Sequence, residues 1–135
     1  MIKYLLDTNI CIYIIKRKPE QVFKKFRSLA LGDVAISSIT LAEMQYGIAK
    51  SSKQTKNQEA LDQFLLPLEI LDFTSSAAIE YGKIRSTLAS KGTPIGSMDL
   101  LIAAHARSIG AVLVTNNTRE FKRVDNIKVE NWVKD

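Results

Sequence analysis

The sequence predicts an α/β protein in which helices cover both faces of a mostly parallel sheet. Short, β-branched apolar runs alternate along the chain with segments whose apolar residues recur at helical spacing. The strand-like runs are apolar throughout, as in strands that are buried on both faces. With 135 residues, no internal repeat and no long linker, the chain is expected to form a single domain over residues 1–135.

The composition narrows the class of protein. Hydrophobic residues make up 46% and charged residues 24%, as in soluble globular proteins. No apolar run approaches the ~18 residues that a membrane helix needs, and the first residues do not resemble a signal peptide. Cys11 is the only cysteine, so an internal disulfide is excluded and a cytoplasmic protein is expected. The net charge of +5 favours a polyanionic partner, although many basic proteins bind none.

The first half of the chain is expected to contain three strands with helices between them. An apolar run at residues 2–6 predicts the first strand, and the isoleucines of residues 10–15 predict a helix. Pro19, in the turn that follows, suits a first helical turn. The remaining elements expected here are a helix over 22–29, a strand over 34–36, a helix over 40–48 with Tyr46 partly buried, a loop or exposed helix start over 50–59, a helix over 60–65 and a strand over 68–73.

The second half is expected to add two helices and two strands. Thr74, Ser75 and Ser76 predict a helix cap. Ser97 is expected to cap a later helix, and Gly110 to end it. The expected elements are a helix over 77–89, a loop over 91–96, a helix over 97–106, a strand over 111–115, a turn or short helix over 119–121 and an edge strand over 127–129 before Trp132.

Three acidic residues lie where a strand or loop passes into a helix. Asp7 ends the first apolar run abruptly, and Glu43 and Asp99 lie near the starts of later helices. Each also has a structural explanation. Asp7 suits a helix cap, Glu43 fits a capping box that begins at Thr40, and Asp99 would gain from the helix dipole.

The three acids together point to a metal site. In a parallel sheet with right-handed crossovers, such junctions gather along one edge, where open α/β sheets bind their ligands. Carboxylates brought close together repel one another unless a cation lies between them. Oxygen donors without a nearby histidine or cysteine suit Mg²⁺ or Mn²⁺. Asp7, Glu43 and Asp99 are therefore predicted to be metal ligands, because a metal so held can acidify water and neutralise a phosphodiester.

Four motifs that span the whole chain in order carry a resemblance to a known family. They are Leu5–Asn9, Glu43 within Ile39–Gly47, Gly92–Gly96 with Asp99, and Val114–Phe121. Together they resemble the PIN domain, and most closely the VapC-type toxins of bacterial toxin–antitoxin pairs. The resemblance implies a three-layer α/β/α sandwich and a Mg²⁺- or Mn²⁺-dependent endoribonuclease in which Asp7, Glu43 and Asp99 form the acidic triad.

One position departs from the acidic pattern of the family. PIN domains often carry a fourth acid two positions after the threonine that ends the fourth strand, which is Thr115 here; Asn117 occupies this position. An amide can bind a hydrated metal but brings no charge, which puts a second metal in doubt. Glu120 could compensate, or it could be an exposed acid paired with a neighbouring Lys or Arg. The hydroxyl and amide side chains expected either to orient the acids or only to cap helices are Thr8, Asn9, Ser97 and Thr115.

The resemblance also implies partners. Toxins of this family cut structured RNA, often tRNA at its anticodon region. A VapB-type antitoxin holds them inactive by placing its tail in the acidic groove, so a toxin–antitoxin hetero-oligomer and a homodimer are expected.

Other polar residues are expected to have structural roles. His105, the only histidine, lies almost two turns after Asp99, and a catalytic role is not expected for it. Packing is the favoured interpretation for Cys11. Solvated surface charge is favoured over contact with RNA phosphates for Lys16, Arg17, Lys18, Lys24, Lys25, Arg85, Arg107 and Arg119.

Three alternative functions remain open. A catalytically weak or inactive PIN module that only binds RNA or antitoxin is favoured by Asn117 and opposed by the three acids. A phosphatase of the haloacid dehalogenase type would use Asp7 as nucleophile, but it needs a second Asp where Asn9 stands. A receiver domain would need an adjacent acid pair and a lysine after a late strand, and the sequence shows neither.

Overall fold

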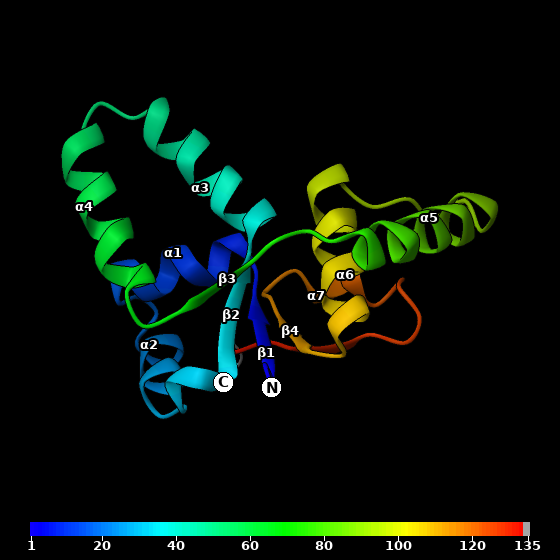
Figure 1. Ribbon diagram of the computed structural model, residues 1–135, viewed down its shortest axis with the longest axis horizontal. Coiled ribbons are helices and arrows are strands. Elements are labelled where there is room, and N and C mark those ends of the chain that lie inside the picture. Colours follow the sequence, from blue (N-terminus) through cyan, green and yellow to red (C-terminus); the bar gives the residue numbers. More distant parts are fainter. Residues whose placement is uncertain (134–135) are drawn as a thin grey trace.

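The computed structural model describes residues 1–133 and contains a five-stranded sheet in which every strand pair is parallel (Figure 1). The strand order is β3-β2-β1-β4-β5. The strands are β1 (Tyr4–Leu6), β2 (Val34–Ser37), β3 (Glu69–Leu71), β4 (Val112–Val114) and β5 (Lys128–Glu130). The parallel sheet predicted from the sequence is confirmed, and β1, which leads into Asp7, lies at its centre.

Helices cover both faces of this sheet and complete the three-layer sandwich (Figure 1). On one side lie α1 (Thr8–Lys16), α2 (Glu20–Arg27), α3 (Ser38–Ala49) and α4 (Gln54–Leu65). On the other side lie α5 (Ser75–Ser90), α6 (Ser97–Ile109) and α7 (Thr118–Phe121). A short 3₁₀ turn, Leu31–Asp33, leads into β2.

The central strand divides the interior into two apolar cores. Leu5 and Leu6 are both fully buried, but successive side chains of a strand point to opposite faces. Leu5 therefore packs with α5 and α6, whereas Leu6 packs with α1 and α4. Because both faces of β1 are buried, the strand is held in position at the point where it ends in Asp7.

The ends of two helices lie in the left-handed region of backbone conformation. Gly110 ends α6 with φ of 67°, as the sequence predicts. Arg17 ends α1 with φ of 59°, and its backbone N–H donates to the carbonyl of Ile14. Glycine adopts this conformation without steric cost, whereas an arginine there is strained.

Several details differ from the sequence-based expectations. The residue that precedes α6 and takes the cap position is Gly96, without a side-chain cap, so Ser97 is the first helical residue and its expected capping role is wrong. The polar stretch after Lys50, expected to be a loop or an exposed helix start, is a short loop and then the exposed start of a helix that begins at Gln54. Tyr46 is 67% exposed and lies outside the core.

Within residues 1–133, no helix is long and apolar enough to cross a membrane.

The two-sided burial of β1 leads to a prediction on stability. Leu6→Ala should lower the free energy of unfolding by about 2–5 kcal/mol, because it removes a fully buried side chain from the core. Leu66→Ala is the matched control, because Leu66 is 76% exposed and its truncation should change stability by less than about 0.5 kcal/mol. Urea unfolding of both variants measures the difference, and equal losses would contradict the described packing.

Candidate active site

Four acidic side chains gather where the carboxyl ends of neighbouring parallel strands meet. Asp7 follows β1, Glu43 lies on the helix after β2, Asp99 lies in the first turn of α6, and Glu120 lies in α7 after β4. The negative charges of Asp7, Glu43 and Glu120 all raise the pKa of Asp99, so the four carboxyls act on one another. This edge is where open α/β sheets bind their ligands.

Asp7 is at once a helix cap and a member of this group. Its Oδ1 accepts a hydrogen bond of 3.0 Å from the backbone N–H of Ile10, and only 5% of the residue is exposed. Burial raises the pKa of Asp7, and a hydrogen bond from the Thr115 hydroxyl partly offsets this effect. The capping role inferred from the sequence is therefore confirmed, and it fixes the orientation of the carboxylate.

Glu43 is held by a neighbouring helix and does not serve as a cap. The cap of α3 is Ser37, so Glu43 lies in the second turn of the helix and the capping box with Thr40 is wrong. The Thr40 hydroxyl is buried without a hydrogen-bond partner among residues 1–133. Thr8 instead donates its hydroxyl to Glu43 Oε1 at 2.6 Å. This bond connects the start of α1 to the acid on α3.

The pKa of Asp99 is shifted far from its ordinary value. Its pKa is raised to about 7, first by burial, then by its hydrogen bond to Glu120 and by the negative charges around it. The pKa of Glu120 is lowered, chiefly by a hydrogen bond from the Asn117 amide. The proton that the Asp99 and Glu120 carboxyls share therefore belongs to Asp99, so Glu120 carries the negative charge.

Asn117 and Glu120 lie inside the group of acids. The Asn117 amide donates to Asp99 Oδ2 at 3.4 Å and also to Glu120 Oε2. Glu120 Oε1 accepts a hydrogen bond of 3.2 Å from the backbone N–H of Gly96. The structure thus places Glu120 against Asp99, and not in an ion pair with a neighbouring Lys or Arg among the described residues.

The donor set fits a divalent cation that prefers oxygen ligands. All four acids offer carboxylate oxygens, and burial together with the neighbouring negative charges raises the pKa of Asp99. In the part of the chain that the structure describes, no three acidic, histidine or cysteine side chains are close enough to hold one ion together. Glu43 instead accepts a hydrogen bond from Thr8, and Glu120 accepts one from Asn117.

The expected supporting residues divide into two sets. Thr8 and Thr115 contact the acids directly, and the Thr115 hydroxyl also accepts a 2.9 Å hydrogen bond from the backbone N–H of Asn117. Asn9 is exposed, and only its backbone N–H bonds to Asp7. Ser97 is also exposed. Among residues 1–133, no hydrogen bond joins the side chain of Asn9 or Ser97 to any of the four acids.

A buried polar pair behind the acids was not anticipated from the sequence. His105 Nδ1 lies 2.7 Å from Ser37 Oγ, and both residues are buried. Ser37 Oγ accepts from the backbone N–H of Ile39 at 3.1 Å, so its own proton is free for Nδ1 of a neutral His105. Burial lowers the pKa of His105. The pair joins α6, which carries Asp99, to the start of the helix that carries Glu43.

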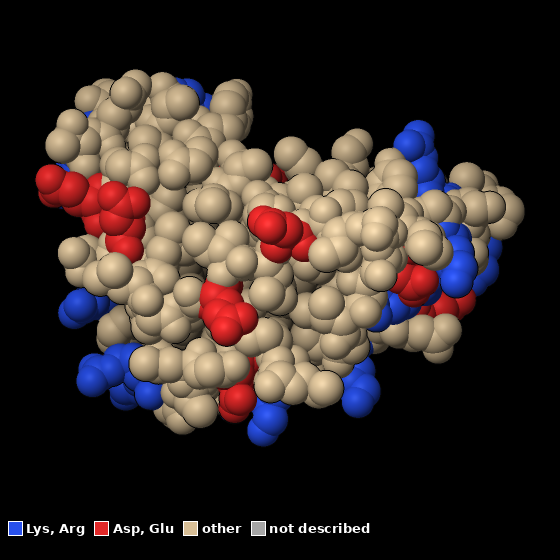
Figure 2. Space-filling view, in the orientation of Figure 1, with Lys and Arg blue, Asp and Glu red and all other residues tan. Residues whose placement is uncertain are grey.

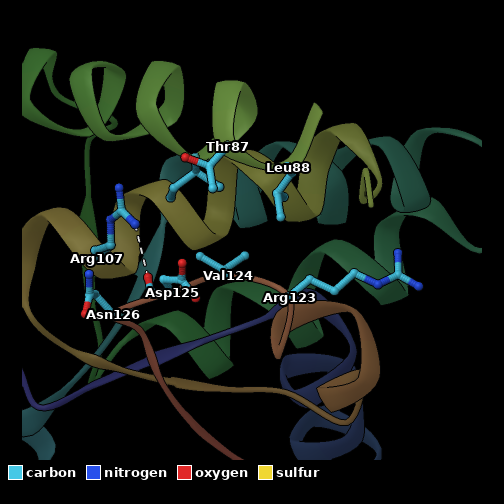
Figure 3. A pocket seen from close by; sticks show the side chains of 8 residues that line it. Thr87, Leu88, Arg107, Arg123, Val124, Asp125 and Asn126 are labelled. Atoms are coloured by element: carbon cyan, nitrogen blue, oxygen red, sulfur yellow. Dashed lines mark hydrogen bonds between the residues drawn. The ribbon is translucent and has the colours of Figure 1, made fainter. Parts of the chain in front are cut away.

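A hollow lies away from the acids, between α5, α6 and residues 123–126 (Figure 3). It is a pocket of about 230 Å³, and none of the four acids lines it. Arg107 donates from Nη1 to the carbonyl of Asp125 at 3.0 Å and from Nε to Glu80 at 2.7 Å. These bonds join α6 to α5 and to the loop before β5, so this arginine has a structural role.

Comparisons with known proteins cover nearly the whole chain. The PIN domain family model matches residues 4–127. Ribonuclease VapC2 of Rickettsia felis is 51% identical over 132 residues, which cover 97% of this chain and 98% of the relative. The tRNA(fMet)-specific endonuclease VapC of Salmonella typhimurium is 48% identical, over 98% of this chain and 99% of the relative.

Solved structures agree with these relatives. The structure of VapBC2 from Rickettsia felis bound to a promoter DNA fragment matches with a TM-score of 0.91 at 50% identity, over 98% of this chain and 99% of that chain. DNA-bound VapBC from Salmonella typhimurium matches with a TM-score of 0.92 at 48% identity, over 98% and 99% of the two chains.

The raised pKa of Asp99 leads to a prediction on pH dependence. Between the unfolded value of 3.8 and the folded value of about 7, the folded chain binds more protons than the unfolded one. Stability therefore falls as the pH rises through this range in the absence of metal. The side chain of Asp99→Asn cannot ionise, so at pH 8 this variant should be more stable than the parent by roughly 1–2 kcal/mol. Solvent screens the charge of the half-buried carboxyl, which keeps the gain below that of a fully buried group.

Urea unfolding at about pH 4 and pH 8 with EDTA present measures this effect. The gain should shrink at the lower pH, where the carboxyl is protonated in the folded parent and only about half ionised in the unfolded chain. Asp62→Asn, at an exposed acid on α4, is the control and should show no such dependence. A gain that is the same at both pH values would contradict the assignment.

The buried pair leads to a prediction of coupling. Ser37→Ala and His105→Leu should each destabilise the protein by about 1–3 kcal/mol, because each leaves a buried polar group or helix end without its partner. The double variant should lose about 1 kcal/mol less than the two single losses together, since the contact can be removed only once. Chemical denaturation of the four proteins measures the coupling, and simple additivity would rule out the contact.

Proposed function

The chain belongs to the PIN-domain family, among the VapC-type ribonuclease toxins of toxin–antitoxin systems, and on this basis we propose a divalent-metal-dependent endoribonuclease that acts on a tRNA. The observation that carries the proposal is that four carboxyls interact at one edge of the sheet, where burial and their negative charges together raise the pKa of Asp99 to about 7. A group of acids so arranged costs stability, which is typical of a site that binds a cation.

In this proposal Asp7, Glu43 and Asp99 hold Mg²⁺ or Mn²⁺. A divalent cation so bound acidifies water and neutralises charge on a phosphodiester. The carboxyls must be ionised to bind it, so its affinity should rise with pH as Asp99 loses its proton. Thr8 and Thr115 would orient Glu43 and Asp7, because their hydroxyls already contact these acids.

Asn117 would position the acids, and Glu120 would supply the fourth negative charge. The amide of Asn117 reaches both Asp99 and Glu120, so it brings a carboxylate three residues further along the chain into the group. This contact supports the idea that Glu120 compensates for the missing acid at position 117. Asn9 and Ser97 have no place in the proposed machinery, because their exposed side chains lie outside these contacts.

The proposed substrate is tRNA(fMet), cut in its anticodon region in the cytoplasm. The support is the name of the Salmonella typhimurium relative, a tRNA(fMet)-specific endonuclease that is 48% identical along nearly the whole chain. Mapping of new RNA 5′ ends after brief induction in cells would identify the substrate and the bond.

The proposed inhibitor is a VapB-type antitoxin, in a toxin–antitoxin hetero-oligomer. The support is a groove between α1, α3 and α4, whose wall is mostly apolar and which runs up to Thr8 and Glu43. Its apolar lining includes Ile12, Ile15 and Met44. An antitoxin segment with apolar side chains and a neighbouring basic residue would match both parts of this groove. The homodimer expected from the family resemblance stays a prediction.

The proposal predicts loss of RNA cleavage in Asp7→Asn. Cleavage of purified tRNA(fMet) should fall by about 10²–10⁴-fold, because one oxygen ligand with its charge is lost while asparagine still caps α1. EDTA should abolish cleavage by the parent, and Mn²⁺ should restore it. Asp62→Asn is the control at an exposed acid and should cleave at the parent rate.

Cleavage at the parent rate by a highly purified Asp7→Asn protein would contradict the proposed metal-dependent chemistry. The alternative of an inactive module that binds RNA or antitoxin makes a different prediction. It requires that millimolar Mn²⁺ fails to bind the parent and leaves its thermal midpoint unchanged.

A further inference from the structure

One segment of the chain carries an excess of positive charge equal to that of the whole protein. Residues 16–27 contain six basic side chains and one acidic side chain, a net charge of +5. The other 123 residues contain thirteen basic and thirteen acidic side chains, so the net charge of +5 of the whole chain resides in this segment. We call it the basic segment; its cations are Lys16, Arg17, Lys18, Lys24, Lys25 and Arg27.

The structure gathers these cations at one end of the molecule. All six are exposed, and they lie at the end of α1, in the turn that follows it and on α2. Figure 2 shows basic side chains gathered over the α2 end of the molecule, at the lower left. Only Lys24 has a close acidic partner among residues 1–133, the exposed Glu20 at 3.0 Å. Five cations are therefore left to face solvent together.

Two of the cations are held in place by the same aromatic ring. The guanidinium carbon of Arg17 lies 5.0 Å from the centre of the Phe23 ring, and that of Arg27 lies 5.7 Å from it. Stacking on a ring leaves the N–H groups of an arginine free for phosphate oxygens. The ring thus preorganises two phosphate-binding groups that would otherwise be mobile.

The backbone at Arg17 is in a conformation that suits glycine better. Its φ of 59° is left-handed, and the helix end it forms is made by backbone hydrogen bonds that glycine would make equally well. A non-glycine residue kept in a strained conformation is a sign that its side chain is needed. Here the side chain contributes a charge to the basic segment.

The basic segment is connected to the acids by α1 and by the groove. This helix begins next to Asp7 and ends at Lys16, about 12 Å further on at 1.5 Å per residue. Lys16 lines the same groove as Thr8 and Glu43. An RNA strand with one phosphodiester at the acids could therefore place phosphates a few nucleotides further along against the basic segment.

We propose that residues 16–27 form a second RNA-binding surface, which binds the phosphate backbone of the substrate away from the bond that is cut. The proposal rests on the proposed ribonuclease function and adds where the rest of the RNA lies. The sequence alone favoured solvated charge at five of these positions, all but Arg27, but the gathering of the cations and the stacked arginines favour phosphate contacts. An acidic protein segment is the other occupant that the charge admits, and the experiment separates the two.

The test compares two variants of equal charge in the Asp7→Asn background, which prevents cleavage during the measurement. The first carries K16Q, R17G, K25Q and R27Q. The matched control carries K53Q, K56Q, K83Q and K128Q, at exposed lysines outside the segment. Binding of labelled tRNA(fMet) is measured over a series of salt concentrations, and circular dichroism checks the fold of each protein.

The segment variant should bind tRNA at least about tenfold more weakly at 0.1 M salt, and the slope of log affinity against log salt should fall by about 3. The control should bind like the parent. The single change Arg17→Gly should weaken binding while its thermal midpoint is equal to or above that of the parent, because the strained residue has been relieved. That pair of results separates a binding role from a structural one.

Three results would overturn the inference, and one of them would also overturn the proposed function. Equal losses in the segment variant and the control would show only general electrostatic attraction. Unchanged tRNA binding together with lost binding of a co-purified VapB-type antitoxin would assign the surface to protein. Absence of tRNA binding by the Asp7→Asn parent would overturn both this inference and the proposed function, whereas the first two results leave that function standing.

Discussion

The repulsion among carboxylates at one edge of the sheet is the constraint around which this structure is arranged. Four acids interact there, and burial adds to their mutual repulsion at Asp99. Such an arrangement persists only if the surrounding structure holds each side chain in place. The apolar cores on both faces of β1 supply that stability, because they hold the strand that presents Asp7 from two sides.

Local hydrogen bonds then determine how each acid is presented. Asp7 is fixed by the first turn of α1, Glu43 by the hydroxyl of Thr8, and Glu120 by the amide of Asn117. The bonds come from different elements, so the site depends on the relative position of α1, α3 and α7. Behind them, the buried pair of His105 and Ser37 connects the two helices that carry Asp99 and Glu43.

The sequence predicted those features that depend on local patterns. Apolar runs located the strands, and the abrupt change at Asp7 located both the cap and the edge of the sheet. Contacts between distant residues could not be predicted in this way. The capping box at Thr40 and the cap at Ser97 were plausible locally, but Ser37 and Gly96 occupy those places. The bond between Ser37 and His105 joins residues 68 positions apart, and no spacing rule indicates it.

The nine-residue helix α1 takes part in each of the surfaces for which a binding role is proposed. The inner face packs on the sheet through Ile10 and Ile14, the outer face lines the groove through Ile12 and Ile15, and the helix connects Asp7 to the basic segment. Under the proposed roles, a change in this groove that prevented antitoxin binding would also disturb the helix that begins at Asp7 and leads into the basic segment. If these roles hold, few changes in the groove can weaken antitoxin binding without also weakening the proposed activity.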